Sequence, residues 1–201
     1  MIELPKKCLV NKFISKKTFY EKISISNAVK DEFVNEIEKI FWLYKLSEDT
    51  IGISKTEKIE EIEIFQLNLK NKTIPRNVIK TITKGIPYKI LFILKYNEEF
   101  CYSIKVDDIF ATEWNKEIEV DFNTINLDIL FEFIVKQVID TKDDNRNIKV
   151  IIDEKNTIND LEKKINHLKT KIKKEKQFNK KVELNIELNK SINELEEITN
   201  E

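Results

Sequence analysis

The last quarter of the chain, residues 153–201, contains neither proline nor glycine. Within it, apolar side chains recur at alternating steps of three and four, at Ile158, Leu161, Ile165, Leu168 and Ile172. This spacing places them on one stripe of an α-helix, as in the seam of a coiled coil. An unbroken helix over this segment would extend about 70 Å, further than a body of this size can cover. The segment therefore predicts a long helix that meets a second surface.

Charged residues along this segment are sorted by sign. Residues 163–181 include nine lysines and one acid, whereas residues 183–201 include six glutamates and one lysine. The apolar register also slips, because the first frame would place Glu175 and Asn179 on the seam. A second frame resumes beyond them, at Leu184, Leu188, Leu195 and Ile198. A slip of this kind marks a bend or a change of partner.

Two arrangements satisfy both observations, and each uses the two apolar frames as an association seam. In one, the chain reverses near residues 177–179, so that its basic half lies against its own acidic half. In the other, two straight helices from two copies of the chain pair antiparallel. A parallel pair would place like charges together and is disfavoured. Because no glycine or proline offers a turn, the sequence favours the straight helix and a homodimer.

The preceding residues, 1–150, predict a compact α+β body. Hydrophobic residues make up 41% of the chain and charged residues 35%, which indicates a globular protein with a strongly solvated surface or a long helix. A chain of 201 residues has room for one core of ordinary size and an appendage. The expected organisation is thus a globular body over residues 1–150 and a long, coiled-coil-like helix or helical hairpin over residues 153–201.

Within the body, we expect helices packed on a small, mostly antiparallel sheet. Apolar residues from Phe33 to Tyr44 recur with helical spacing and predict a helix over residues 27–46. Proline and glycine at Pro75 and Gly85 bracket a shorter helix, and Asn126 offers a cap to another. Strands are predicted over residues 59–69, 90–96 and 100–106, with one or two more near residues 109–122. The polar residues 141–147 are the predicted boundary of the body.

The opening 25 residues are basic and carry apolar side chains between the lysines. This composition predicts an arm held against the body with its lysines outward. Such lysines could contact phosphates, but the favoured interpretation is a solvated surface whose aromatic side chains belong to the core. The candidate contact residues in this arm are Lys6, Lys7, Lys12, Lys16 and Lys17.

Few residues offer catalytic chemistry. His167 is the single histidine, so zinc sites and histidine-dependent catalysis are not expected, and no cofactor or metal is predicted. Two glycines are too few for a glycine-rich phosphate loop. The remaining enzyme hypothesis is a metal-dependent nuclease, which needs carboxylates converging beside a lysine. Its candidate residues are Glu60, Glu61, Glu63, Asp107, Asp108 and Glu113, with Lys70 or Lys105.

The overall charge and the two cysteines limit the binding partners and the cellular location that we expect. A net charge of −1 predicts neither nucleic-acid nor lipid binding by the chain as a whole, although local lysine runs could bind nucleic acid. No segment has the roughly 20 apolar residues that cross a bilayer. Cys8 and Cys101 lack metal-site spacing and are expected to be reduced and mostly buried. We therefore expect a cytoplasmic protein without membrane contact.

Four stretches of the chain carry a resemblance to a known family: LPKKCLVNKFISKKTFYE, IPRNVIKTITKGIPYKILFILKY, ATEW and KKEKQFNKKVELN. In this order, they resemble the bacterial family of domain of unknown function 4391. Ser15 stands where the family often has proline, and Lys180 where arginine is common. The resemblance implies no activity. It implies an accessory role beside the helicases and DNA methyltransferases of restriction-type, antiviral defence loci, and draws attention to Gln177, Phe178 and Asn179.

The leading expectation is a non-enzymatic interaction protein, with a helicase or methyltransferase partner by resemblance and a possible homodimer through the last helix. The alternative is a nucleic-acid-binding accessory factor. It would use the basic arm together with residues around the lysine run, namely Lys173, Lys174, Lys176, Gln177, Phe178, Asn179, Lys180 and Lys181. A nuclease is the third hypothesis.

Overall fold

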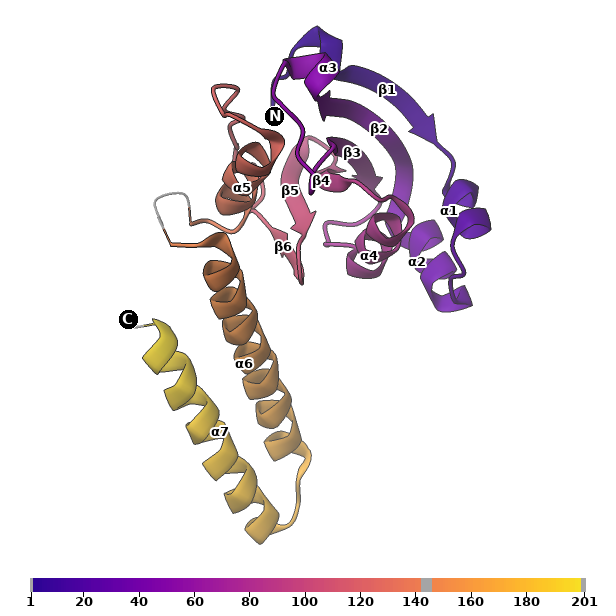
Figure 1. Cartoon of the computed structure of the whole chain (residues 1–201). Helices are drawn as coiled ribbons and strands as arrows, with labels where there is room; N and C mark the ends of the chain where they lie inside the picture. The colour runs from indigo at the N-terminus through magenta and orange to yellow at the C-terminus, as the bar shows by residue number, and fades with distance from the viewer. Residues whose placement is uncertain (1, 142–145, 200–201) are drawn as a thin grey trace. The chain divides into compact units, whose positions relative to one another are not determined.

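The computed structural model describes residues 2–141 and 146–199, which fall into two compact units (Figure 1). Unit 1 comprises residues 1–144 and unit 2 residues 145–201. The division lies within the polar stretch 141–147, of which residues 142–145 are outside the described part. No helix among the described residues is long and apolar enough to span a membrane.

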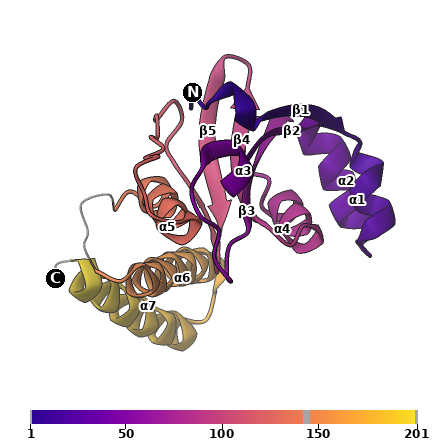
Figure 2. The ribbon, with the colours of Figure 1, turned by 45° about the horizontal axis from the view of Figure 1, so that its top comes forward.

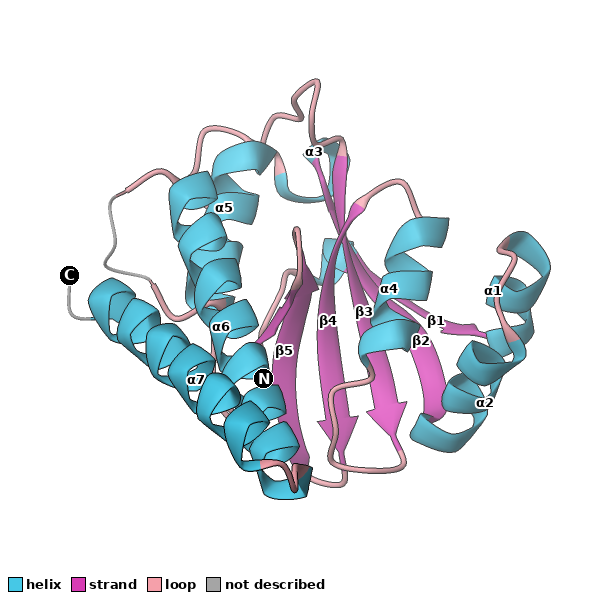
Figure 3. Cartoon of the chain, turned by 90° about the horizontal axis from the view of Figure 1, so that it is seen from below, coloured by secondary structure: helices cyan, strands magenta, loops and turns pink. Residues whose placement is uncertain are grey.

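Unit 1 is built on a six-stranded sheet whose strands lie side by side in chain order (Figure 3). The strands are β1 (Leu9–Ile14), β2 (Ile37–Ser47), β3 (Glu61–Leu69), β4 (Lys89–Tyr96), β5 (Glu99–Lys105) and β6 (Ile109–Ala111). Every neighbouring pair is antiparallel except β3 and β4, which are parallel. That pair needs a crossover connection, which α4 (Arg76–Gly85) supplies. The predicted α+β class with a mostly antiparallel sheet is confirmed.

One face of the sheet carries the helices α1 (Lys16–Lys22), α2 (Asn27–Glu36) and α4. The apolar side of α4, with Val78, Ile79 and Ile82 fully buried, packs in a core that includes Phe65 of β3 and Phe92 of β4. In Figure 1, α4 lies inside the curve of β2 and β3. We call this side the helix face of the sheet.

The opposite face is covered at one end. There α5 (Leu127–Val138), capped by the Asn126 side chain, packs with its apolar side inward, and Lys89 lies 5.6 Å from the Phe131 ring (Figure 2). The short helices η1 (Lys6–Cys8) and α3 (Glu48–Ile51) belong to the same unit. Near the N-terminus, the Ile2 amide donates to the hydroxyl of buried Tyr102 at 2.6 Å.

One predicted element is wrong. The helix expected over residues 27–46 ends at Glu36, and β2 begins at Ile37. Residues 37–47 are mostly β-branched, aromatic or leucine, and as a strand they pair with β1 on one side and β3 on the other. Of the one or two strands expected near residues 109–122, one is present, the short β6, and residues 118–122, all described, form no strand.

Unit 2 is an antiparallel helical hairpin of α6 (Ile148–Lys174) and α7 (Phe178–Thr199) (Figure 1). The favoured expectation of one straight helix is therefore wrong, and the chain reverses over residues 175–177. Helix α6 begins at Ile148, five residues before the predicted start of the helical segment at residue 153.

Candidate functional site

The hairpin turn is closed by a carboxylate and not by glycine or proline. Glu175 leaves the helix with φ −73° and ψ 134°, and its Oε1 atom accepts from the amides of Lys176 and Gln177, both at 2.8 Å. These amides have no helical partner, so the side chain replaces one. The same bonds lower the pKa of Glu175, with a smaller effect of Lys180 and Lys181. A charged side chain thus makes the turn.

The apolar stripes of the two helices lie within this hairpin. Ile165 and Leu168 of α6 and Ser191 of α7 are buried. The other predicted seam residues, Ile158, Leu161, Ile172, Leu184, Leu188, Leu195 and Ile198, are half-buried. Lys164 forms an ion pair with Glu187 of α7 at 3.2 Å. The basic half of the segment therefore lies against its acidic half within one chain.

A second apolar stripe of α7 is left exposed. Phe178, Val182 and Ile186 are spaced four residues apart, so they lie along one side of the helix. Their exposed fractions are 77%, 42% and 66%. We call these three residues the α7 ridge. Sequence reasoning selected Phe178 but missed Val182 and Ile186, although their four-residue spacing was a usable signal.

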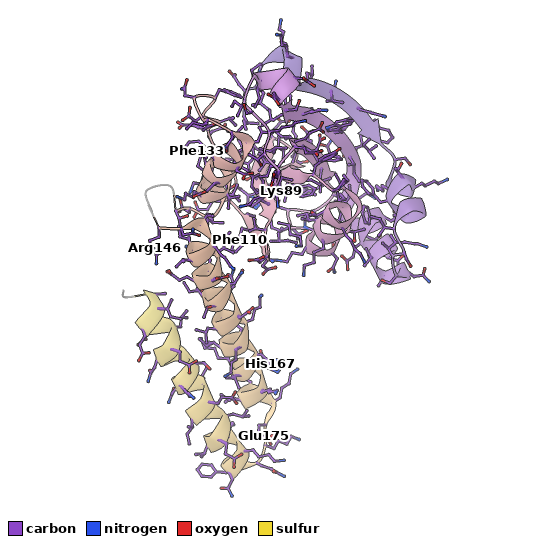
Figure 4. All side chains as sticks on the ribbon, viewed as in Figure 1. Lys89, Phe110, Phe133, Arg146, His167 and Glu175 are labelled. Carbon is purple, nitrogen blue, oxygen red and sulfur yellow. The ribbon has the colours of Figure 1, made fainter. Side chains whose placement is uncertain are left out.

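The predicted lysines of the hairpin surround the start of the ridge. Lys173, Lys174, Lys176, Lys180 and Lys181 are all exposed, as are Gln177 and Asn179. A hollow of about 560 Å³ between the helices carries both signs of charge, because Lys171, Lys174 and Lys180 share it with Glu183 and Glu187. The exposed tip is therefore basic, whereas the inner hollow is mixed. Figure 4 shows Glu175 at this tip and His167, which is exposed, further along α6.

The lysines of the N-terminal arm do not gather at one place. Lys6 and Lys7 lie on η1, Lys12 on β1 and Lys17 on α1, and all four are exposed. Lys16 is committed to the fold, since its Nζ atom donates to the Ile37 carbonyl at 2.5 Å. Burial, and then the charge of Lys70, lower the pKa of this amine. The arm is held in the sheet by β1.

Two of the candidate carboxylates meet on the helix face of the sheet. Glu63 of β3 is only 4% exposed and lies directly opposite Lys45 of β2, which forms an ion pair with Glu61. Burial, and then Glu61, raise the pKa of Glu63 to about 7. Its Oε2 atom has no hydrogen-bond partner among the described residues. The pair thus has the character of two carboxyls sharing one proton beside a lysine.

The other nuclease candidates do not join this pair. Asp108 contacts Arg76 at 3.5 Å. The two candidate lysines donate to backbone carbonyls, Lys105 to Val106 at 3.2 Å and Lys70 to Val34 at 2.7 Å. Within the described residues, no three histidine, cysteine or acidic side chains are placed to hold a metal ion. The sequence had singled out Glu63, but Lys45 was missed because the pairing of β2 with β3 was not foreseen.

The two cysteines are free and buried, and each thiol belongs to unit 1. Burial raises the pKa of Cys8, and raises that of Cys101 to about 12. Neither thiol is therefore an activated nucleophile at neutral pH.

The sequence of this chain matches a known protein family. The sequence profile described as Domain of unknown function (DUF4391) matches residues 2–195, which is nearly the whole chain. The chain belongs to the DUF4391 family. The matched region takes in both the sheet of unit 1 and most of the hairpin, so the α7 ridge and its lysines lie inside the family's boundaries. No similar protein was found among curated proteins, and none among solved structures.

Proposed function

We propose that this DUF4391 member is a non-enzymatic interaction protein that docks a protein partner through its C-terminal hairpin. The observation that carries the proposal is the α7 ridge, whose three apolar side chains are exposed at helical spacing. A single exposed apolar residue is ordinary, whereas a row of three along one helix face is what a helix presents to a hydrophobic groove.

The energetics favour Phe178 as the anchor of such an interface. Burying a side chain of this kind stabilises a complex by roughly 1.5–3 kcal/mol before the costs of association. Large aromatic side chains commonly dominate binding energy. The exposed lysines around Phe178 would meet an acidic rim on the partner and accelerate the encounter.

A different protein fits this surface better than a second copy of the chain. A homodimer through the seam would require the hairpin to open, because the seam is already occupied within one chain. Two ridges paired tip to tip would also bring two lysine clusters together, which costs free energy.

The proposed partner is a helicase or DNA methyltransferase subunit of a restriction-type antiviral defence locus. The proposal is supported by the family resemblance and by the exposed apolar side chains of the α7 ridge, which a protein partner would bury. Unit 1 would then be available to contact the partner or the nucleic acid that the partner binds. Among the described residues, no third acidic, histidine or cysteine side chain joins Glu61 and Glu63 to form a group that could hold a metal ion.

Nucleic-acid binding through the hairpin tip is the second candidate, and the five exposed lysines there favour it. Phosphate contacts of this number would make affinity fall steeply with salt. Replacing Lys173, Lys174, Lys180 and Lys181 by glutamine should abolish such binding and leave an apolar interface largely intact.

The experiment is co-expression of the chain with the proposed partner, a helicase or DNA methyltransferase subunit of a restriction-type locus, followed by affinity purification at moderate salt. We expect a stoichiometric complex that Phe178→Ser/Ile186→Ser disrupts. The matched control is Val34→Ser/Ile125→Ser, two exposed apolar residues of unit 1. Equal capture by both variants would contradict the proposal.

A further inference from the structure

The face of the sheet opposite the helix face is partly open, over parts of β1, β2 and β3. Strand pairing fixes which residues share this face. One row across the strands runs Phe13, Phe41, Gln66, Ile93 and Tyr102. The next row runs Lys39, Asn68, Lys95 and Phe100. We call the exposed and half-exposed members of these rows the open-face site: Phe13, Phe41, Gln66, Asn68, Lys39, Lys95 and Phe100.

The aromatic side chains of this site are accessible. Phe13 is 58% exposed and packs edge-on against Phe41, with ring centroids 5.9 Å apart. Phe41 and Phe100 are half-buried. Helices α1, α2 and α4 pack on the helix face instead, where they contribute Phe19, Phe33 and Ile79 to the core. A face of a ring that no helix covers can stack on a flat ligand.

Two amides lie between the aromatic side chains. Gln66 donates from Nε2 to Oδ1 of Asn68 at 2.8 Å, and both side chains are half-exposed. This bond uses one donor and one acceptor, which leaves the Gln66 carbonyl and the Asn68 amino group side by side. An adjacent acceptor and donor match the edge of a nucleobase.

The charge of the site is positive. Lys39 of β2 and Lys95 of β4 are the residues directly across from Asn68 on the two neighbouring strands. Lys39 makes only a 3.8 Å contact with Glu38, and both of these side chains are more than half exposed, so the ion pair is weak. Lys95 forms no ion pair with another described residue. Neither row, as the structure describes it, contains a carboxylate.

We propose that the open-face site binds single-stranded nucleic acid. Phe13, with Phe41 behind it, and Phe100 stack on unpaired bases, Gln66 and Asn68 contact base edges, and Lys39 and Lys95 contact phosphates. The proposal is independent of the hairpin and of its partner, because it rests on residues of unit 1 alone.

A single strand fits this chemistry better than a duplex or an apolar protein surface. Rings lying on a sheet can stack only on bases that are not already stacked in a helix. An apolar protein surface would leave the two free amide groups and two lysines buried without partners, which costs free energy.

The test is fluorescence anisotropy of the full chain with a labelled oligo(dT) of about 15 nucleotides, a length that covers one such site. We expect binding in low salt and about tenfold weaker binding by Phe13→Ala. Two phosphate contacts predict a slope of about −1.4 for log affinity against log salt. The double change Lys39→Gln/Lys95→Gln should bring that slope close to zero.

Two controls separate this site from the hairpin tip. Val34→Ala removes an apolar side chain of similar exposure on α2 and should bind as the unchanged chain does. Phe178→Ala should also have no effect. No binding at low salt, or a loss caused by Phe178→Ala with none caused by Phe13→Ala and by the lysine pair, would overturn the proposal. So would tighter binding to a duplex of the same length.

Discussion

Glu63 is a buried carboxyl group whose surroundings disfavour its charged form. A carboxyl that is 4% exposed, with one oxygen unpartnered among the described residues, holds its proton to about pH 7. An unfolded glutamate loses its proton near its ordinary pKa of 4.5. Between these values the folded chain binds more protons than the unfolded chain, so the free energy of unfolding falls as pH rises.

The first prediction concerns this carboxyl. In the unchanged chain, the ionisation of Glu63 should lower the free energy of unfolding by roughly 3 kcal/mol between about pH 4.5 and pH 7. In Glu63→Gln this decrease should be absent. Urea unfolding at about pH 5 and about pH 8 measures it. The control is Glu60→Gln, an exposed carboxyl one strand position before Glu61. An equal drop in the Glu63→Gln and Glu60→Gln chains would show that Glu63 is ionised in the folded state.

Glu175 is the residue on which the hairpin turn depends. The second prediction is that Glu175→Gln accelerates hydrogen exchange at the amides of Lys176 and Gln177, because the neutral side chain is a weaker acceptor. Because the pKa of Glu175 is lowered, its carboxylate stays charged and keeps these bonds through the usual glutamate titration range. Their stabilising effect is lost only as pH falls through the lowered pKa. Exposed Glu162→Gln on α6 should leave both amides unchanged.

At the scale of elements, several were predictable because their signals are local. Pro75 and Gly85 bracket α4, Asn126 caps α5, and a two-residue turn with Asn97 at φ 53° joins β4 to β5. Each signal depends on residues within one element or turn. Such patterns can be read without knowing what lies across the sheet.

Other elements could not be predicted, because their partners are far away in sequence. The spacing of Phe33, Ile37 and Ile40 fits a helix, but β2 is stabilised by strands from both sides. The hairpin, one of the two arrangements that the sequence left open, was not favoured for a different and local reason. Its turn has no glycine or proline and is capped by Glu175 in a lysine run. The burial of Glu63 and the exposure of Phe13 depend on which strands pair. This pairing cannot be read from the sequence.

The hairpin as an element yields a third prediction. Leu168→Ala should destabilise it by about 2–3 kcal/mol, because a leucine that is 3% exposed leaves a cavity when truncated. Hydrogen exchange of α6 and α7 in the full chain measures the loss. Val182→Ala, which removes a side chain that is 42% exposed, should cost far less. Equal effects would mean that Leu168 is not part of the seam.

At the scale of the whole molecule, unit 1 and unit 2 offer different surfaces. Unit 1 presents aromatic side chains, amides and two lysines on an open sheet, and unit 2 presents an apolar ridge among lysines. We infer a division of labour, in which the hairpin holds a protein partner while the sheet meets a strand of nucleic acid.

A fourth prediction follows from this division. Ridge and open-face variants should act independently, since additive effects are expected for separate sites. Phe178→Ser should lower affinity for the partner without changing affinity for oligo(dT), and Phe13→Ala should do the reverse. Titrations of each variant against each ligand give the four affinities. A variant that weakens both interactions would indicate a single shared surface.

The proposed interaction depends most on the α7 ridge being an interface. The direct measurement is the Kd, by calorimetry, for the proposed helicase or methyltransferase partner. It compares the unchanged chain with Phe178→Ser/Val182→Ser/Ile186→Ser. The account predicts that the triple change weakens binding about a hundredfold or more while circular dichroism stays the same. A Kd unchanged by the triple change would contradict it.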